Sequence, residues 1–248
     1  MITIIIPVFN EASRLRALLP SIPTHVLGLS VTTIVADDGS TDDSVTVARM
    51  SGAIVVSLPV NRGKGAALKA GLAHAAELGF DYLVTMDGDG QHDPVDLAHL
   101  VGPVMAGSCD IALGSRYAND RARGAAPLNR YLVKEAVVAY LKRVVDTPHT
   151  DPFCGYRCFS REALDHVRFR GNGYQSELEA IFDAAIQRLR VIEVPVQRVY
   201  LEGSSKMGVH RGPFVGRLSV MAQYLGTIRK KTVELREAGG SVPSTSKN

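Results

Sequence analysis

Short runs of apolar, mainly β-branched residues alternate along the chain with longer amphipathic segments. The short runs predict five strands, at residues 2–6, 31–36, 53–58, 82–86 and 110–113, and the longer segments between them predict helices. This alternation favours an α/β fold with a mostly parallel sheet and helices on both of its faces. The first run lacks a basic leading segment and is interrupted by Pro7, so it predicts a strand and not a signal peptide.

Polar residues and glycines cluster where the predicted strands end. They lie at residues 7–11, 37–40, 61–65 and 87–92, after the first, second, third and fourth strands respectively. Ligands of open α/β sheets bind beyond the carboxyl ends of the strands. We therefore expect the functional site along this edge of the sheet.

Two carboxylates, Asp87 and Asp89, follow the fourth predicted strand and are separated by Gly88. Residues two apart in extended chain point to the same side, so the two side chains can converge on one point. A carboxylate pair with few other ligands suits Mg²⁺ or Mn²⁺, which takes its remaining oxygens from water and a substrate phosphate. Taken by itself, the segment is equally typical of an ordinary Asp-Gly turn after a strand.

Two further segments suggest a nucleotide site. Residues 37–44 either form a capped strand-to-helix turn or offer Asp37 and Asp38 to a ribose or base edge. Residues 61–67 open a helix with two glycines around Lys64, which suits an anion at the helix N-terminus. The spacing is not that of a P-loop, and no GxGxxG follows the first strand, so a dinucleotide-dependent dehydrogenase is disfavoured.

The composition fits a folded protein of one main domain. The chain has 248 residues, of which 46% are hydrophobic and 21% charged, and its net charge is +3. No apolar run approaches the roughly 20 residues of a membrane-spanning helix. The three cysteines predict reduced thiols that pack in the core or in loops, because no zinc-like spacing accompanies them. We expect a cytoplasmic protein, with peripheral contact at the cytoplasmic membrane face left open.

Positive charge is concentrated near the C-terminus. Residues 203–237 carry seven Lys or Arg against two Glu, a balance of 7 − 2 = +5. Apolar residues at helical spacing form one stripe there, made of Phe214, Leu218, Met221, Leu225 and Ile228, followed by the basic cluster 229–231. Such a helix either lies in an anionic membrane interface or packs on protein, on this domain or on a second copy. Nucleic-acid binding is disfavoured because stacking aromatics are not interleaved with the basic residues.

The ordered motifs of the chain resemble those of the family-2 glycosyltransferases, which have a GT-A (Rossmann-like) fold, and most closely those of their dolichyl- or polyprenyl-phosphate hexosyltransferase branch. The resemblance spans residues 2–207 and is carried by the segments 6–11, 37–40, 61–65, 87–92, 114–117, 150–157 and 203–206. It implies a nucleotide-sugar donor, a divalent metal, Mg²⁺ or Mn²⁺, and transfer of the sugar with inversion. Gly88, Gly90 and Cys154 depart from the residues usual in that branch and leave the subfamily open.

The resemblance also implies roles for individual residues. The base, ribose and donor would be held by Pro7, Phe9, Glu11, Asp37, Asp38, Lys64, Asp87 and Gly88. The metal would be held by Asp87, Asp89 and Gln91. The donor would be GDP-mannose, as the first choice, or a UDP-hexose.

Cations from residue 116 onward match an acceptor that is a phosphate. The acceptor-phosphate candidates are Arg116, Arg130, Arg157 and Lys206, and the catalytic candidates are Asp89, Arg116 and Asp151. A phosphate monoester is already ionised and needs cations more than a base, whereas a hydroxyl acceptor needs a general base, for which Asp151 is the candidate. A non-catalytic nucleotide-binding protein is the third alternative, and the intact carboxylate pair argues against it.

The sequence predicts three parts. They are a GT-A catalytic domain at 1–202, a basic amphipathic segment at 203–237 and a disordered tail at 238–248. Residues 118–127 precede an amphipathic helix at 128–145 and suggest a mobile lid over the donor. The oligomeric state, including a homo-oligomer, is left open.

Overall fold

The computed structural model describes residues 1–118, 128–145, 149–197 and 213–239. The strands are β1 (Ile2–Val8), β2 (His25–Val26), β3 (Leu29–Asp37), β4 (Ile54–Ser57), β5 (Tyr82–Thr85), β6 (Ile111–Ser115), β7 (Arg157–Ser160) and β8 (Val191–Pro195). The helices are α1 (Ala12–Ser21), α2 (Ser44–Met50), α3 (Lys64–Leu78), α4 (Leu97–Met105), α5 (Leu128–Val144), α6 (Arg161–His166), α7 (Ser176–Ile186) and α8 (Pro213–Glu237), with a 3₁₀ turn at Pro94–Asp96. The five predicted strands are all present, to within a few residues at each end. The predicted lid lies outside the described residues.

The strands form one mixed sheet in the order β2-β3-β1-β5-β7-β6-β8, with β4 also pairing with β3. β1 pairs in parallel with β3 and β5, and β6 pairs in parallel with β8. β7 lies antiparallel between β5 and β6, and β2 is antiparallel to β3. The predicted sheet is therefore confirmed as α/β and mostly parallel, while β2, β7 and β8 were not predicted.

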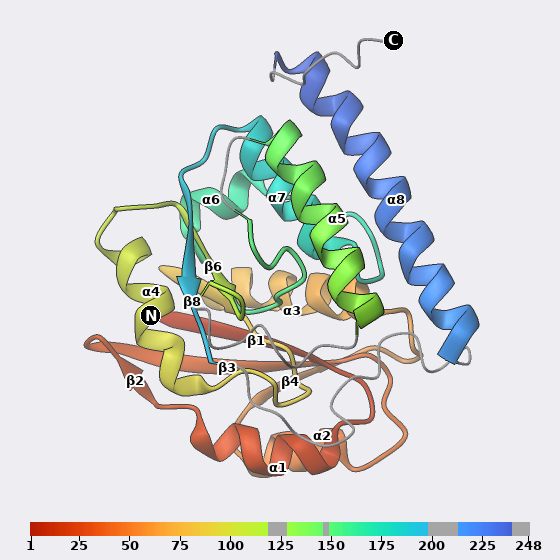
Figure 1. Cartoon of the computed structure of the whole chain (residues 1–248). Coiled ribbons are helices and arrows are strands. Elements are labelled where there is room, and N and C mark those ends of the chain that lie inside the picture. Colours follow the sequence, from red (N-terminus) through yellow and green to blue (C-terminus); the bar gives the residue numbers. More distant parts are fainter. Residues whose placement is uncertain (119–127, 146–148, 198–212, 240–248) are drawn as a thin grey trace, which may run out of the picture.

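Helices cover both faces of the sheet (Figure 1). Successive strand residues point to opposite faces, so Ile5 and Leu83 face one layer while Ile4 and Val84 face the other. The first layer contains α3, α5, α6, α7 and α8, and the second contains α1, α2 and α4. The strands read as near-continuous apolar runs because both faces of the sheet are buried.

The C-terminal helix packs on the domain along its described half. Tyr224, Ile228 and Leu235 are buried in the core layer that also contains α7, and Thr232 Oγ1 lies 2.6 Å from Tyr140 Oη on α5. Leu225, predicted to lie on the apolar stripe, is 61% exposed. Of the predicted stripe, Ile228 therefore packs on the domain and Leu225 does not, and the side chains of Phe214, Leu218 and Met221 lie outside the described ones. No helix in the described part of the chain is long and apolar enough to cross a membrane.

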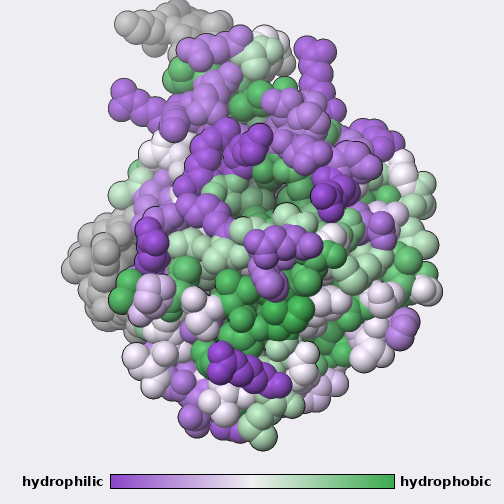
Figure 2. Space-filling view, turned by 180° about the vertical axis from the view of Figure 1, so that it is seen from behind, coloured by the Kyte–Doolittle hydropathy of each residue, from purple (hydrophilic) through white to green (hydrophobic). Residues whose placement is uncertain are grey.

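The basic cluster at 229–231 is divided by this packing. Lys231 is buried and makes ion pairs with Asp183 on α7 and with Glu234, whereas Arg229 and Lys230 are exposed. Lys231 thus does not share the exposed side of the helix with Arg229 and Lys230, because a helix turns 100° per residue and brings that side chain to the core. Seen from behind, the part of the molecule where the C-terminal end of α8 projects is mainly hydrophilic, and hydrophobic residues gather below it (Figure 2).

We expect Lys231→Met to lower the free energy of unfolding by about 2 kcal/mol, because it leaves the buried Asp183 carboxylate with only the half-exposed Arg170 as a cation partner. Lys230→Met, one residue away on the exposed face, should change it by less than about 0.5 kcal/mol. Chemical denaturation of both variants measures the difference. Equal stabilities would show that the Lys231 pair does not hold α8 to the domain.

Candidate active site

The candidate site lies at the edge of the sheet where β1, β3, β5 and β6 end. The segments that follow these strands meet the N-termini of α3 and α7 and the chain before β7. The predicted residues from positions 7 to 157 therefore converge on one edge, as expected for an open α/β sheet. Lys206 lies outside the described residues, and the side chain of Arg130 is not described either.

Asp87 and Asp89 form a carboxylate pair directly after β5. Burial alone would raise the pKa of Asp87, but Lys64 and His92 outweigh it and hold this pKa well below its usual range. Burial and the neighbouring Asp87 charge raise the pKa of Asp89 to about 6. Asp87 thus has enough positive charge beside it, whereas Asp89 does not. A divalent cation bound here would supply the missing positive charge.

This pair fits a metal that is shared with a substrate. In the described part of the chain, no group of three or more His, Cys, Asp or Glu side chains is placed to hold a metal. Two carboxylates alone suit Mg²⁺ or Mn²⁺ bound together with water and phosphate oxygens. Gln91, the third predicted ligand, instead accepts a hydrogen bond from Arg116 through Oε1, at 3.3 Å, so its role at the metal stays a prediction.

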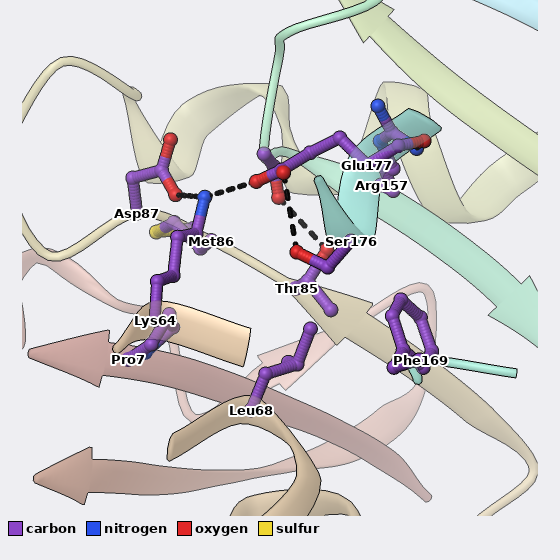
Figure 3. Close-up of a pocket in the computed structure, with 11 residues that line it drawn as sticks. Pro7, Lys64, Leu68, Thr85, Met86, Asp87, Arg157, Phe169, Ser176 and Glu177 are labelled. Atoms are coloured by element: carbon purple, nitrogen blue, oxygen red, sulfur yellow. Dashed lines mark hydrogen bonds and ion pairs between the residues drawn. The ribbon is translucent and has the colours of Figure 1, made fainter. Parts of the chain in front are cut away.

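Lys64, the first residue of α3, lies between two carboxylates (Figure 3). Its Nζ is 2.6 Å from Asp87 Oδ1 and also makes an ion pair with Glu177 in the first turn of α7. Burial would lower the pKa of Lys64, but the two carboxylates raise it. Glu177 was not predicted as a site residue, because nothing in its local sequence distinguishes a buried acid from an exposed one.

The N-terminus of α3 is closed by the chain itself. The amides of Gly65 and Ala66 donate to the carbonyl of Asn172, at 2.8 and 3.3 Å. A Cβ at Gly63 or Gly65 would lie 2.3–2.4 Å from a carbonyl oxygen of residues 171–172, so only glycine allows this close approach. The anion predicted at these amides is therefore replaced by a backbone carbonyl, and the two glycines serve packing.

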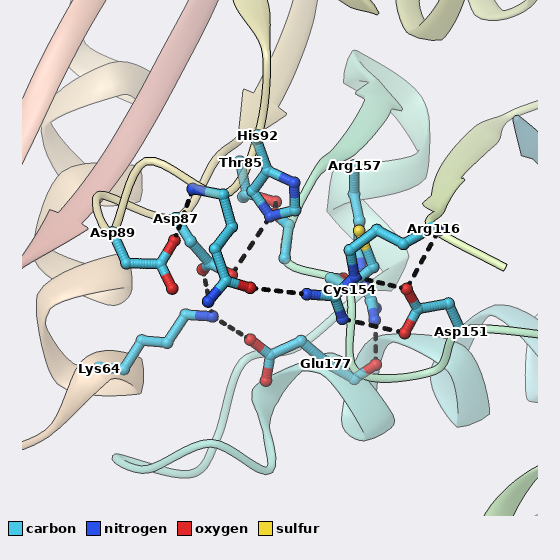
Figure 4. Close-up of polar contacts among 12 residues, drawn as sticks. Lys64, Thr85, Asp87, Asp89, His92, Arg116, Asp151, Cys154, Arg157 and Glu177 are labelled. Atoms are coloured by element: carbon cyan, nitrogen blue, oxygen red, sulfur yellow. Dashed lines mark hydrogen bonds and ion pairs between the residues drawn. The ribbon is translucent and has the colours of Figure 1, made fainter. Parts of the chain in front are cut away.

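Arg116, after β6, forms a two-pronged ion pair with Asp151 (Figure 4). Arg116 Nε is 2.7 Å from Asp151 Oδ2, and its Nη2 is 3.0 Å from Oδ1. The Asp151 side chain is 1% exposed. Burial would raise the pKa of Asp151, but Arg116 outweighs it and holds that pKa below its usual range. Asp151 is thus a counter-ion, and the expectation that it serves as a general base conflicts with this pairing.

Arg157 is committed to the backbone. Its guanidinium donates to the carbonyls of Pro152, Cys154 and Glu177, at 2.6–2.9 Å, and the residue is 2% exposed. The phosphate-binding role predicted for Arg157 conflicts with this geometry, because its donors are used inside the protein. Arg157 instead ties the loop that contains Asp151 to the start of α7.

The predicted nucleotide residues line the neighbouring ends of β1 and β3. Asp38 accepts hydrogen bonds from the amides of Arg62 and Gly63, both at 2.8 Å, and Asp37 accepts one from the Ser40 amide. Burial raises the pKa of Asp38 despite the two amides. Asp38 thus joins the end of β3 to the entry of α3. The other predicted nucleotide residues are Pro7, Phe9, Glu11 and Gly88, of which Glu11 and Gly88 are buried, and their role at a nucleotide stays a prediction.

His92 also belongs to the site, although the sequence suggested no role for it. Its ring is fully buried against Tyr156, and Nε2 is 3.4 Å from Asp87 Oδ2. The ring therefore holds Oδ2 of Asp87, whereas Lys64 holds Oδ1. Its position in the segment 87–92, three residues after Asp89 and next to Gln91, was the signal available.

Gly155 leaves the space that the Asp87 carboxylate fills. A Cβ at this position would lie 2.4 Å from Asp87 Oδ1 and 2.6 Å from Oδ2. We expect Gly155→Ala to displace Asp87 and lower turnover about 100-fold, with destabilisation of about 1–3 kcal/mol. Steady-state kinetics and denaturation check this expectation, and Gly226→Ala on α8, where nothing lies within 4 Å of the added Cβ, is the control for added volume at a glycine. Unchanged turnover in Gly155→Ala would contradict a precise requirement for the Asp87 position.

Known proteins resemble the chain over most of its length. It is 30% identical to the polyprenol monophosphomannose synthase of Mycolicibacterium smegmatis, over 82% of this chain and 80% of that protein. It is 30% identical to the undecaprenyl-phosphate mannosyltransferase of Micrococcus luteus, over 87% and 90%. It is 28% identical to the UDP-N-acetylglucosamine–dolichyl-phosphate N-acetylglucosaminyltransferase of Methanococcus voltae, over 85% and 90%.

The fold is also similar to that of a solved enzyme. Glucosyl-3-phosphoglycerate synthase of Mycobacterium tuberculosis, in complex with Mn²⁺, UDP and glucosyl-3-phosphoglycerate, superposes with a TM-score of 0.70 at 26% identity and covers 94% of this chain and 80% of that one. The predicted GT-A fold is thereby confirmed. The sequence model of glycosyl transferase family 2 matches residues 3–168, well over half of the chain. The chain is a glycosyltransferase and belongs to glycosyl transferase family 2.

Proposed function

We propose that this enzyme transfers a hexose, with inversion, from a nucleotide-sugar to the phosphate of a polyprenyl phosphate. The observation that carries the acceptor class is the Arg116–Asp151 pair. In this pair Asp151, the one predicted base, serves as the counter-ion of Arg116. A hydroxyl acceptor would need a base, whereas an ionised phosphate needs none. The names of the relatives with lipid-phosphate substrates support the same acceptor class.

The proposed reaction breaks the bond between the anomeric carbon and the diphosphate oxygen, and forms a bond from that carbon to an acceptor phosphate oxygen. The nucleoside diphosphate leaves with the electron pair of the broken bond. An acceptor that enters as a dianion has no proton to lose, so the atoms and charges balance without a base. A divalent cation, held by Asp87 and Asp89, would supply charge stabilisation for the departing diphosphate.

The residues of the chain would then divide the remaining work. Asp37 and Asp38, at the end of β3, would hold the nucleoside, with Pro7, Phe9 and Glu11 on the β1 side. Asp151 would fix the orientation of Arg116. The guanidinium N–H groups that do not bind Asp151 would then face the acceptor phosphate. Mannose on GDP is the first choice of donor, and UDP-sugars are the alternative that the UDP-bound structural neighbour supports.

The test is transfer of radiolabelled sugar from a panel of GDP- and UDP-sugars, with Mg²⁺ or Mn²⁺, to a short polyprenyl phosphate. We expect label in the organic phase after extraction, and the anomeric configuration of the product reports inversion. The alternative, a hydroxyl acceptor, predicts no lipid-bound label although the donor binds. The same assay with the corresponding polyprenol, which has a hydroxyl and no phosphate, is the matched control.

A lipid acceptor implies contact with a membrane surface, and Arg229 and Lys230 are two adjacent exposed cations in the described part of α8 that are available for it. We expect Arg229→Gln/Lys230→Gln to weaken binding to anionic vesicles about 10- to 30-fold, at about 1 kcal/mol per cation. Co-sedimentation with vesicles measures this effect, and neutral vesicles are the control. Equal binding by the variant and the unmodified protein would place the membrane contact elsewhere.

A further inference from the structure

The ammonium group of Lys64 already lies against the Asp87 carboxylate, where a divalent cation would bind. Lys64 Nζ lies 2.6 Å from Asp87 Oδ1, and only 17% of its side chain is exposed. Figure 3 shows the ammonium between Asp87 and Glu177, above the wall formed by Pro7 and Leu68. An ammonium at this distance neutralises a carboxylate oxygen that a divalent cation would need as a ligand.

Glu177 is held firmly as the second partner of this lysine. Its Oε2 accepts a hydrogen bond from Ser176 Oγ at 3.1 Å, and its backbone carbonyl accepts one from Arg157 Nη1 at 2.6 Å. The Glu177 side chain is 8% exposed. An ammonium that leaves Asp87 can therefore remain paired with Glu177, which avoids the cost of an isolated buried charge.

We propose that Lys64 is an internal cation that closes the metal position at Asp87, and that Glu177 is the positioning residue that retains Lys64 when the metal enters. This inference rests on the proposed function, because it concerns the same metal position. It makes metal and donor binding cooperative: the metal alone must displace Lys64, whereas a nucleoside diphosphate brings new anionic oxygens for both the metal and the lysine.

The experiment is titration of the full-length protein with Mn²⁺ alone, followed by electron paramagnetic resonance or calorimetry, and then with Mn²⁺ and UDP or GDP together. Lys64→Met should bind Mn²⁺ alone about 10-fold more tightly than the unmodified protein, because no ammonium competes. Lys142→Met, which removes an exposed cation from α5, should bind as the unmodified protein does.

Glu177→Asp separates positioning from simple charge. This variant keeps the negative charge but shortens the side chain, so the carboxylate no longer reaches Lys64. We expect it to bind Mn²⁺ alone about 10-fold more weakly, since Lys64 then has Asp87 as its closer partner. Thermal unfolding of each variant reports whether it is folded. Glu177→Asp leaves the net charge of the site unchanged, whereas Lys64→Met removes one positive charge.

Three outcomes would overturn the inference. Unchanged Mn²⁺ affinity in Lys64→Met would show that the lysine does not compete for Asp87. Unchanged affinity in Glu177→Asp, with tighter binding in Lys64→Met, would show that charge alone matters and that Glu177 does not position Lys64. Absence of Mn²⁺ binding in the unmodified protein, even with nucleotide, would overturn the metal site of the proposed function itself, which distinguishes the two failures.

Discussion

Asp89→Asn is expected to lower turnover about a thousandfold while the fold is retained. The substitution keeps the shape of the side chain but removes one of two carboxylates that would hold the divalent cation against the leaving diphosphate. Loss of such charge stabilisation costs on the order of 4 kcal/mol in the transition state. Steady-state transfer with saturating donor measures it, and Asp43→Asn, an exposed carboxylate on the surface, is the control.

The same variant should be more stable than the unmodified protein without metal at neutral pH. Burial and the Asp87 charge raise the pKa of Asp89 to about 6 in the folded state, above the 3.8 of an ordinary Asp. A raised acid pKa stabilises the fold below pH 4, and that stabilisation is lost as pH rises from about 4 through 6. Lys64 and His92 also act on Asp89 and lower its pKa, and the value of about 6 already includes their effect.

Denaturation of both proteins between pH 4 and 7.5 checks the sign. The stability advantage of Asp89→Asn should grow over this interval as the unmodified protein loses its bound proton. A variant that is inactive and more stable at pH 7.5 would show that the carboxylate is present for function and not for folding. An inactive variant of lower stability, with the advantage absent throughout, would contradict this assignment.

β1 and β3 were predicted because they contain long runs of β-branched residues, whereas β7 was missed because it lacks such a run. β1 and β3 are buried on both faces, so apolar character alone identifies them. β7 has four residues and begins with Arg157, whose charge is balanced by backbone carbonyls that only the folded loop provides. A short strand with a buried arginine cannot be distinguished from a loop by periodicity.

The location of the site could be predicted, but the partners of its charges could not. Asp87 and Asp89 follow a strand, and strand ends share one edge of the sheet. The partners come from far along the chain: Glu177 is 113 residues from Lys64, and Asp151 is 35 residues from Arg116. No local pattern encodes such pairings, which is why Asp151 was taken as a candidate base and Arg157 as a phosphate contact before the structure showed what each one binds.

Arg116→Met is expected to abolish transfer and to lower the free energy of unfolding by about 3–5 kcal/mol. The reason for the second effect is that the Asp151 carboxylate, 1% exposed, would lose the guanidinium that neutralises it. Arg116→Met/Asp151→Leu removes both charges and should recover most of the lost stability, because a buried ion pair replaced by apolar side chains is often neutral for folding. Chemical denaturation of the two single variants and the double variant forms a closed cycle.

The activity of the double variant shows whether the Arg116–Asp151 pair serves acceptor binding or only the stability of the fold. If Arg116 binds the acceptor phosphate, the double variant is stable and inactive, and a donor-binding titration by calorimetry shows that the nucleotide-sugar still binds. Asp151→Asn adds the complementary test, because an asparagine still accepts a hydrogen bond from Arg116 but cannot take a proton. Substantial transfer by Asp151→Asn, with an unchanged pH profile, is the expected result for a counter-ion; complete loss with unchanged stability would restore Asp151 as a base and favour a hydroxyl acceptor.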